Sequence, residues 1–569
     1  MLLEQRLGAA FAAVIGEPAD PAVRRSQRAD FQVDGALAVA RGLGKNPRDI
    51  AAQVLEQDQL TDVCASAEIA GPGFINLTVR EDVLARMVTG MAADERLGVP
   101  PSESPERLVV DYSAPNVAKE MHVGHLRSTF IGDAVVRLLE WFGHEVIREN
   151  HIGDWGTPFG MLIEHLLDIG EQETAHGLSI GDLDGFYKAA RAKFDNNEPF
   201  GDRARKRVVL LQGGDEATLR LWHVLISESE KYFMTVYERL DVRLTAEDFV
   251  GESAYNDQLS SVVDELARVG LLRDSDGAQC VFPTGFLNRD GDPLPLIVRK
   301  RDGGYGYAST DLATIRSRIR DLAVTRMLYV VGVPQRQHFE MVFEVAREAG
   351  WLMPPIRAEH VGFGSILGAD GKLLRSRAGD SIKLVDLINE AISRAEQALA
   401  ANNPNLDAST RANVARAVGI GAIKYADLST DRTKDYVFDY DRMLSFDGNT
   451  APYLQYAHAR IHSIFRKAGI KPEDASAKIA IAEPAEHELA IALLGLEGLL
   501  RDLEQTLDFH RLSGYLFGLA SVFTTFYEHC PVLRADVPIR DSRLALCNLT
   551  ARVLAQGLDL LGITAPEQM

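Results

Sequence analysis

The chain has 569 residues, too many for one ordinary hydrophobic core, so three or four domains are expected. Apolar residues make up 46% and charged residues 25%, which is the balance of a folded soluble protein. The formal net charge of −20 argues against broad, non-specific nucleic-acid binding but leaves room for one local basic footprint.

Export signals and structural metal sites are not expected. The N-terminal segment carries acidic and basic side chains early and lacks a long apolar run, so it is a poor signal peptide. No stretch approaches the roughly 20 apolar residues that span a bilayer. The four cysteines are scattered, without a metal-binding spacing, and a disulfide framework is not expected in so large a chain. These features predict a cytoplasmic enzyme without structural zinc.

The first hundred residues predict a small α+β unit. Helical patterning at 1–15 and 49–57 surrounds loops, and residues 74–79 alternate like a half-buried strand. Prolines and serines at 100–105 then indicate a linker.

A β-turn-α pattern follows the linker and returns later in the chain. The first run is a strand at 107–112, a loop at 113–121, a helix at 122–142 and a strand at 145–148. The second run is a strand at 294–299, a helix at 312–319, a strand at 328–332 and a helix at 339–348. This alternation predicts a parallel sheet with crossover helices. The helix-rich region at about 170–285 is interpreted as an insertion between the two halves.

Strand signals vanish from residue 384 onward, and an all-α region is expected. Helical periodicity covers 384–400, 411–428, 451–468, 485–507, 511–528 and 541–561. The predicted units are therefore 1–100, 101–383, a helical connection at 384–450, and 451–569.

The most informative segment is His122-Val123-Gly124-His125, between the strand and the helix of the first run. Open α/β sheets bind ligands at the carboxyl edge of their parallel strands. Both imidazoles lie on one side of the first helical turn, whose N-terminus attracts phosphate. Gly124 removes a side chain, so an adenine ring can lie on the backbone. From the spacing alone, a pair of helix-capping histidines explains the motif equally well.

The residues around this motif resemble a known family. The block 111–129 resembles the HIGH signature of class I aminoacyl-tRNA synthetases, in the version of arginyl-tRNA synthetases, and residues 151–157 resemble another segment of that family. The resemblance covers essentially the whole chain, with only the insertion weakly matched. It implies a Rossmann-type catalytic domain with an inserted subdomain, an α+β N-terminal additional domain and an all-α anticodon-binding domain.

The resemblance also implies a reaction. Arginine would be activated with ATP and Mg²⁺ to arginyl-adenylate and pyrophosphate, and then esterified to the 3′-terminal adenosine of tRNA(Arg) for protein synthesis. His122, Gly124 and His125 would bind ATP, with the histidines stabilising charge on its α-phosphate. Activation would require bound tRNA. A monomer that binds neither DNA nor membrane is expected.

The second signature of this class, a lysine-rich loop, has its candidate at 371–380. Lys372 is present, but Arg375 replaces the second lysine and offers a planar fork in place of a point charge. In many arginyl-tRNA synthetases a lysine just before the histidine motif is thought to substitute, and Lys119 matches that position. On its own, the segment is explained by a polar turn.

Carboxylates suit the recognition of arginine because they pair with a guanidinium bidentately. The positions matching the family's arginine pocket are Asp111, Asn116, Tyr307, Asp311 and Gln335. Other members carry glutamate where this chain has Asp111. Taken alone, Asp311 is explained more simply as an acid near a helix N-terminus.

Aromatic residues at both ends of the chain match positions that contact tRNA in the family. Tyr453 and Tyr456 stand at the entry to the anticodon-binding region, where they could stack on unstacked bases. Phe74 and Asn76 belong to the additional domain, which touches the outer corner of the tRNA. Core packing explains either tyrosine slightly better, and a turn followed by a strand explains the N-terminal pair nearly as well.

Three other functions fit parts of the pattern. A synthetase for another amino acid, such as cysteine, would carry zinc ligands, which the scattered cysteines do not supply. A small-molecule nucleotidyltransferase would not need the helical C-terminal third. A catalytically dead RNA-binding relative would not need intact His122, His125 and Lys119.

Overall fold

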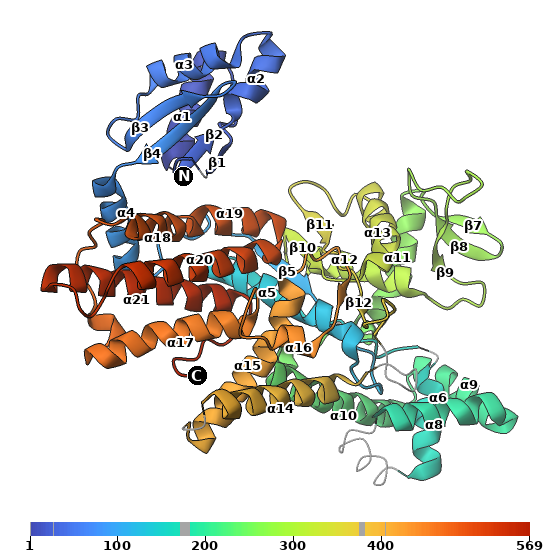
Figure 1. The fold of residues 1–569 in the computed structure, drawn as a ribbon. Helices are drawn as coiled ribbons and strands as arrows, with labels where there is room; N and C mark the ends of the chain where they lie inside the picture. The colour runs from blue at the N-terminus through green and yellow to red at the C-terminus, as the bar shows by residue number, and fades with distance from the viewer. Residues whose placement is uncertain (1, 27, 157, 171–182, 375–381, 404–405) are drawn as a thin grey trace.

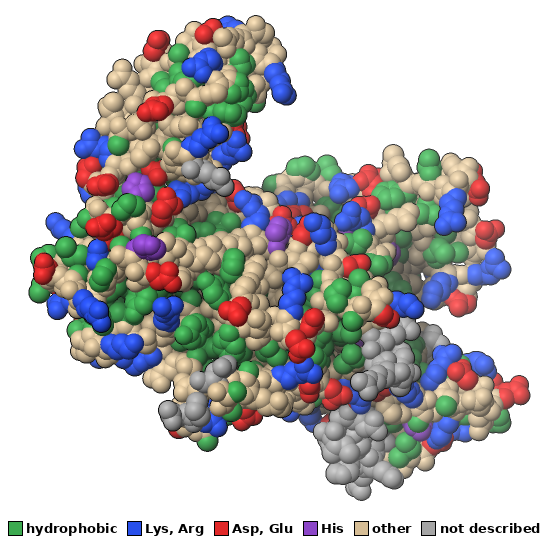
Figure 2. All heavy atoms as spheres, in the orientation of Figure 1, with side chains coloured by type: hydrophobic (Ala, Val, Ile, Leu, Met, Phe, Trp, Pro, Cys, Tyr) green, Lys and Arg blue, Asp and Glu red, His purple; other side chains and the backbone are tan. Residues whose placement is uncertain are grey.

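The computed structural model describes residues 2–26, 28–156, 158–170, 183–374, 382–403 and 406–569. Figure 1 shows an N-terminal unit that stands apart at the top, a helical C-terminal region at the centre and left, and the sheet-bearing part at the right. On the face seen in Figure 2, acidic and basic side chains are interspersed, and the surface is hollowed between the N-terminal unit and the lobe that carries β7–β9.

The predicted α+β unit is confirmed, and it contains a four-stranded antiparallel sheet with helices. The sheet order is β1-β2-β4-β3. In β4 the buried side chains alternate, and Ile75, Leu77 and Val79 point into the core. The elements are α1 (Leu2–Ile15), β1 (Val23–Arg25), β2 (Phe31–Val33), α2 (Gly35–Leu43), α3 (Pro47–Gln57), β3 (Cys64–Ala70), β4 (Phe74–Val79) and, leading to the rest of the chain, α4 (Glu81–Ala93).

The predicted parallel sheet is confirmed, with strand order β11-β10-β5-β6. Its strands are β5 (Arg107–Asp111), β6 (Glu145–Glu149), β10 (Arg326–Tyr329) and β11 (Arg357–His360). The helices between and beside them are α5 (Leu126–Trp141), α12 (Tyr307–Arg320) and α13 (Arg336–Glu348), with the short turns η1 (Val123–His125) and η4 (Val333–Gln335). The register aligns the last residues of β10, β5 and β6, which are Tyr329, Asp111 and Glu149, at the carboxyl edge of the sheet.

Two of the expected strands differ from the structure. The strand expected at 294–299 is β9 (Leu296–Arg299), which belongs to a separate antiparallel sheet with β7 (Arg273–Ser275) and β8 (Ala278–Val281). An alternating pattern does not reveal which sheet a strand joins. The strand expected at 328–332 begins earlier, at Arg326, which is in register with Leu108 and Arg357 on the neighbouring strands. The buried side chain of Arg326 also pairs with Glu359 on β11.

The insertion is helical, as expected, apart from the β7–β8 hairpin. Its helices α6, α8 and α9 pack on one another and lie together at the lower right of Figure 1. The elements are α6 (Pro158–Ile169), α8 (Leu183–Asn196), α9 (Glu198–Gln212), α10 (Glu216–Leu240), η2 (Ala246–Asp248), η3 (Glu252–Tyr255) and α11 (Asn256–Arg268).

The C-terminal region is helical, with two departures from the prediction. The helix expected at 485–507 breaks at Gly495, and a two-residue strand, β13 (Tyr436–Val437), pairs in parallel with β12 (Ile366–Leu367). So short a strand carries no periodicity. The helices are α14 (Leu384–Asn402), α15 (Ala408–Leu428), α16 (Tyr440–Met443), α17 (Ala451–Ala468), η5 (Pro472–Asp474), α18 (Pro484–Leu494), α19 (Leu496–Thr506), α20 (Phe509–His529) and α21 (Val537–Leu560). Among the helices that the structure describes, none is long and apolar enough to cross a bilayer.

Helix α5 lies directly against the strand that precedes it, because Gly132 has no side chain. A Cβ at Gly132 would lie 2.3–2.4 Å from atoms of the Tyr112 side chain, which is fully buried. This close approach sets the position of α5 on the sheet, and therefore of the turn at its N-terminus.

Gly132→Ala is therefore expected to destabilise the protein by about 1–3 kcal/mol, the usual cost of overpacking a core. Gly518→Ala is the matched control, because no atom lies within 4 Å of a Cβ at that position in the interior of α20. The control is expected to stabilise by about 0.5–1 kcal/mol through helix propensity. Urea unfolding followed by circular dichroism measures both midpoints. Equal midpoints for Gly132→Ala and the wild type would contradict the packing argument.

Candidate active site

The two histidines of the motif cap the turn at the start of α5. His122 Nδ1 accepts the Gly124 N–H at 3.0 Å, and His125 Nδ1 accepts the His122 N–H at 3.1 Å. The His122 carbonyl oxygen also lies 3.3 Å from His125 Nδ1. This nitrogen can either accept from the N–H or donate to the carbonyl, but not both, because an accepting ring nitrogen carries no proton. The contact with the N–H is shorter, so Nδ1 is assigned as the acceptor. Both imidazoles are therefore assigned their proton on Nε2. The capping role does not compete with ligand binding, because it occupies only Nδ1.

Burial keeps both imidazoles neutral. It lowers the pKa of His125 to about 3, with a smaller contribution from neighbouring His122. Burial also lowers the pKa of His122, and the positive charge of Lys119 adds to that effect. Two neutral rings with Nε2–H groups at a helix N-terminus are ready hydrogen-bond donors for phosphate oxygens.

The loop before the turn has a strained backbone. Ser113, Ala114 and Ala118 have φ angles of +71°, +48° and +59°, a left-handed region that costs a residue with a Cβ about 1–2 kcal/mol. Two hydrogen bonds hold this course: the Ala114 N–H donates to Asn150 Oδ1 at 2.9 Å, and the Ala118 N–H donates to Ser229 Oγ at 3.0 Å. The path from β5 to the histidines is thus set by the surrounding elements.

The segment that follows the predicted lysine-rich loop pairs with the histidine turn. Residues 121–123 and 382–384 are joined by backbone hydrogen bonds of 3.1 and 2.9 Å and by a bridge between His122 and Lys383. Lys383 Nζ donates to Glu120 at 2.9 Å. The chain just after the second signature segment is therefore attached directly to the first signature.

The described part of that loop is a tight turn. The Gly368 N–H donates to the Lys372 carbonyl at 2.8 Å, and the Leu374 N–H donates to the Ile366 carbonyl at 3.0 Å. The Lys372 side chain is exposed. Arg375 lies outside the described residues. Lys372 therefore lies in a polar turn, and its exposed side chain is also free to serve as the predicted cation. Its contact with a phosphate remains a prediction.

One buried guanidinium occupies the carboxyl edge of the sheet. Arg318 of α12 is fully buried, and its Nη2 lies 2.7 Å from Asp111 and 2.5 Å from Glu149. Its Cζ lies 4.9 Å from the centroid of the Tyr329 ring. Asp111, expected to hold the guanidinium of a substrate, is therefore engaged by a guanidinium of the chain itself.

A second set of acids near α12 has no arginine or lysine counter-ion among the described residues. Burial and the charges of Asp154 and Asp311 raise the pKa of Glu252 to about 8. No described residue forms a hydrogen bond or ion pair with the Glu252 side chain. Asp311 accepts a hydrogen bond from His338 Nε2 at 2.6 Å, and its other carboxylate oxygen has no recorded partner in the described residues. A cationic ligand would favour the ionised form of Glu252, so this pair of acids suits a cation.

The other candidates for the arginine pocket lie in the loop after β5, at the start of α12 and in the turn after β10. Asn116 pairs with Gly153, where a Cβ would lie 2.6 Å from the Asn116 Oδ1. Tyr307 opens α12 and is 75% exposed, so its hydroxyl is free to meet a ligand. Gln335 is exposed in η4, between β10 and α13. Lys119 is half-buried, and its Nζ lies 4.3 Å from the centroid of the Tyr187 ring.

Three residues of this site were not found by sequence reasoning: Glu149, Glu252 and Arg318. Arg318 is one of three arginines in α12 at every second position, and nothing in the sequence distinguishes the one that reaches the edge of the sheet. Glu252 lies in a short 3-10 turn without periodicity. Glu149 follows directly after the strand expected at 145–148. A carboxylate at the carboxyl edge of a parallel sheet could have marked it as a candidate site residue.

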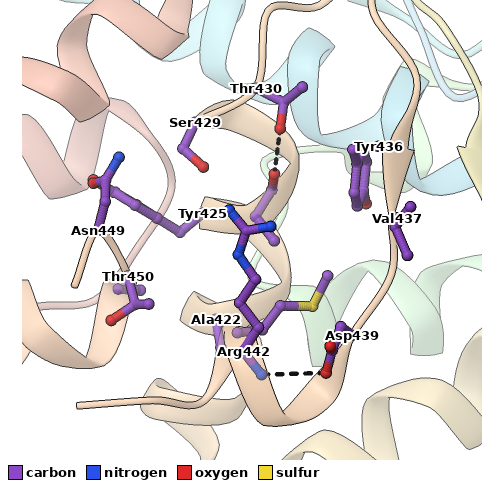
Figure 3. Close-up of a pocket in the computed structure, with 13 residues that line it drawn as sticks. Ala422, Tyr425, Ser429, Thr430, Tyr436, Val437, Asp439, Arg442, Asn449 and Thr450 are labelled. Carbon is purple, nitrogen blue, oxygen red and sulfur yellow. Dashed lines mark hydrogen bonds between the residues drawn. The ribbon is translucent and has the colours of Figure 1, made fainter. Parts of the chain in front are cut away.

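A separate cavity lies where the catalytic part meets the helical region (Figure 3). It has a volume of about 100 Å³ and is lined by α15, β13, α16 and the start of α17. Tyr425 donates to Asn449 at 2.6 Å at its edge, and Figure 3 shows the Arg442 side chain reaching among the lining residues. Ligand pockets are usually 300 Å³ or larger, so this cavity does not hold a nucleotide.

The candidate RNA-contacting residues differ in exposure. Tyr456 is 48% exposed on α17, whereas Tyr453 is half-buried with its ring 5.4 Å from that of Phe517. Phe74 and Asn76 are half-buried on β4. Tyr456 is therefore the better placed of the two tyrosines to stack on a base, and Tyr453 packs within the helical region.

Three family models match successive parts of the chain. The N-terminal domain model of arginyl tRNA synthetases matches residues 1–79, the catalytic domain model of class I tRNA synthetases for arginine (R) matches 87–440, and the DALR anticodon binding domain model matches 454–569.

Known proteins resemble the whole chain. The arginine–tRNA ligase of Thermobifida fusca (strain YX) is 56% identical, over 100% of this chain and 98% of its own length. The arginyl-tRNA synthetase structure from Plasmodium falciparum is 29% identical with a TM-score of 0.86, covering 100% of this chain and 98% of its own. That from Thermus thermophilus is 25% identical with a TM-score of 0.82, covering 100% and 99%.

If Asp111 serves Arg318, Asp111→Asn is expected to destabilise the protein by about 1.5–3 kcal/mol, the value of a buried hydrogen bond to a charged group. Asp441→Asn is the control, because that side chain is 91% exposed and its loss should change stability by less than about 0.5 kcal/mol. Urea midpoints measure both changes. An Asp111→Asn protein as stable as the wild type would show that the ion pair is not structural.

Proposed function

The chain belongs to the arginyl-tRNA synthetases of class I, and from this premise we propose that it joins arginine to tRNA(Arg) at the carboxyl edge of its parallel sheet. The reaction uses ATP and supplies aminoacylated tRNA for translation. Two features support this assignment of the site. A turn with two neutral histidine donors supplies a phosphate site, and Glu252 and Asp311, which have no arginine or lysine counter-ion among the described residues, supply a cation site.

The acids are assigned to the substrate guanidinium. Asp311 and Glu252 form the cation site, because Asp111 and Glu149 are already paired with Arg318. A carboxylate accepts a guanidinium through two parallel hydrogen bonds, which lysine cannot reproduce. The exposed Tyr307 hydroxyl is placed to add a third contact on the same helix. Asn116 and Gln335 are assigned to the α-amino and carboxylate end.

The histidine turn is assigned to ATP. The Nε2–H groups of His122 and His125 donate to the α-phosphate, where charge builds up when the arginine carboxylate attacks and pyrophosphate leaves. Gly124 is exposed and leaves the backbone open to the adenine. Lys119, Lys372 and Arg375 would neutralise the phosphates. These are N–H donors and cations, which fit phosphate oxygens, so Mg²⁺ is expected to bind through the nucleotide. When bound, Mg²⁺ neutralises charge on the phosphate oxygens.

The second step transfers the arginyl group to tRNA. The terminal ribose hydroxyl attacks the carbonyl of the adenylate, at the 2′ position that class I enzymes favour, and AMP leaves. Tyr456 is the first candidate to stack on an anticodon base, with Tyr453 beside it, and Phe74 and Asn76 are candidates at the outer corner of the tRNA. We expect activation to require bound tRNA. The domain limits 1–100, 101–383, 384–450 and 451–569, a monomeric state and a cytoplasmic location complete the proposal.

Aminoacylation of bulk tRNA with each labelled amino acid tests the function. Arginine alone should give acid-precipitable label in the presence of ATP and Mg²⁺. His125→Ala should lower the rate by about 10²–10³, the usual loss of one donor to a developing anion. His223→Ala, an exposed histidine of α10, is the matched control and should charge at the wild-type rate. Charging of a different amino acid would overturn the pocket, and no charging at all would overturn the function.

The raised pKa of Glu252 predicts a pH dependence for arginine binding. Between about pH 6.5 and 8 the free enzyme holds this carboxyl protonated, while the guanidinium selects the ionised form, so affinity should rise with pH. The increase should approach tenfold per unit and should flatten above pH 8. The sign for stability is opposite: the folded state binds this proton more tightly, so the free protein loses stability as pH rises from 4.5 towards 8.

Calorimetric titration with arginine at several pH values, with tRNA bound, measures this dependence. Glu252→Gln should weaken binding at pH 8 and remove most of the slope. Glu228→Gln, an acid on the nearby helix α10 whose carboxylate pairs with Lys231, serves as the control and should keep the slope. An unchanged slope in Glu252→Gln would remove Glu252 from the arginine site.

A further inference from the structure

The insertion places an aromatic ring against the phosphate-binding end of the site. Tyr187 lies on α8, and the Lys119 ammonium lies 4.3 Å from the centroid of its ring. An ammonium at that distance is attracted to the face of the ring, by about 0.5–2 kcal/mol depending on how far it is desolvated. Lys119 and Tyr187 are both half-buried, so solvent only partly screens the contact.

The contact restrains the side chain of Lys119, whose preceding backbone is already held. The backbone before it is held by the Ala118 N–H, which donates to Ser229 Oγ at 3.0 Å, and by the Val117 N–H, which donates to Gly153 at 3.2 Å. Ser229 is fully buried. The long side chain of a lysine otherwise samples many rotamers, and ordering it costs up to about 2 kcal/mol.

Helix α8 also acts on the histidine turn through charge. The Asp184 carboxylate, one turn before Tyr187, raises the pKa of His122, against the larger lowering by burial and by Lys119. The helix is held firmly, because Leu183, Phe186 and Ala190 are buried, and the Phe186 ring lies 4.9 Å from that of His165 on α6. The insertion therefore places a well-packed helix close to the histidine turn.

We propose that Tyr187 is a positioning residue, whose ring holds the Lys119 ammonium in place for the phosphates of ATP. This inference rests on the proposed function of Lys119 and gives the insertion a part in nucleotide binding. A cation that is already oriented loses less entropy when the phosphates arrive, so its charge acts at full strength in the transition state. The effect runs through Lys119, and Tyr187 itself does not touch the nucleotide.

A double-mutant cycle in the full-length enzyme with tRNA(Arg) bound tests this coupling. Tyr187→Leu should lower kcat/KM for ATP in pyrophosphate exchange by about five- to tenfold, with the KM for arginine changed less than twofold. Tyr187→Phe retains the ring and should restore the wild-type value to within about twofold. In a Lys119→Ala background, Tyr187→Leu should have no further effect, because the partner of the ring is gone.

The outcomes separate a positioning role from a structural one. An equal loss in the Lys119→Ala background, or a parallel increase in the KM for arginine, would overturn the proposal. Faster exchange by Tyr187→Leu would also overturn it, because the ring would then withhold Lys119 from ATP. Tyr187→Met repeats the test if Tyr187→Leu lowers the thermal midpoint. Charging by the wild type is measured first: its failure defeats the proposed function, whereas normal charging with additive variants defeats this inference alone.

Discussion

The buried guanidinium of Arg318 holds together the edge at which the chemistry is placed. It binds Asp111 at the end of β5 and Glu149 at the end of β6, and it lies against Tyr329 at the end of β10. A charge so fully removed from water is tolerated only with close counter-charges, and here two carboxylates supply them. Because the same helix carries Tyr307 and Asp311, one interaction aligns three strands and orients the helix that faces the substrate.

The same arrangement separates the acids that pair with an arginine of the chain from those that we assign to the substrate arginine. The acids at the sheet edge are paired with Arg318, whereas Glu252 has no ion-pair partner among the described residues, and the charge of Asp311 helps to keep it protonated until a cation binds. The phosphate side is prepared in a similar way. A strained loop and a pair of reciprocal caps fix the histidines, so their Nε2–H groups are held in place before the reaction and need little reorganisation during it.

The repetitive parts of this architecture could be predicted from the sequence, and the contacts within the site could not. Helix and strand periodicities located α5, β5, β4 and the helical C-terminal region, and the motif identified His122 and His125. Periodicity does not report partners, so it placed β9 in the wrong sheet and missed β13. The family resemblance suggested Asp111 for the substrate, but nothing local in the sequence shows that Arg318, 207 residues away, pairs with that carboxylate.

A crystal structure with arginine, tRNA(Arg) and a non-hydrolysable ATP analogue tests this division of the acids most directly. The account predicts that the substrate guanidinium lies between Glu252 and Asp311, that Arg318 still bridges Asp111 and Glu149, and that phosphate oxygens lie within hydrogen-bond distance of the His122 and His125 Nε2 atoms. A substrate guanidinium bound at Asp111, with Arg318 displaced, would contradict it.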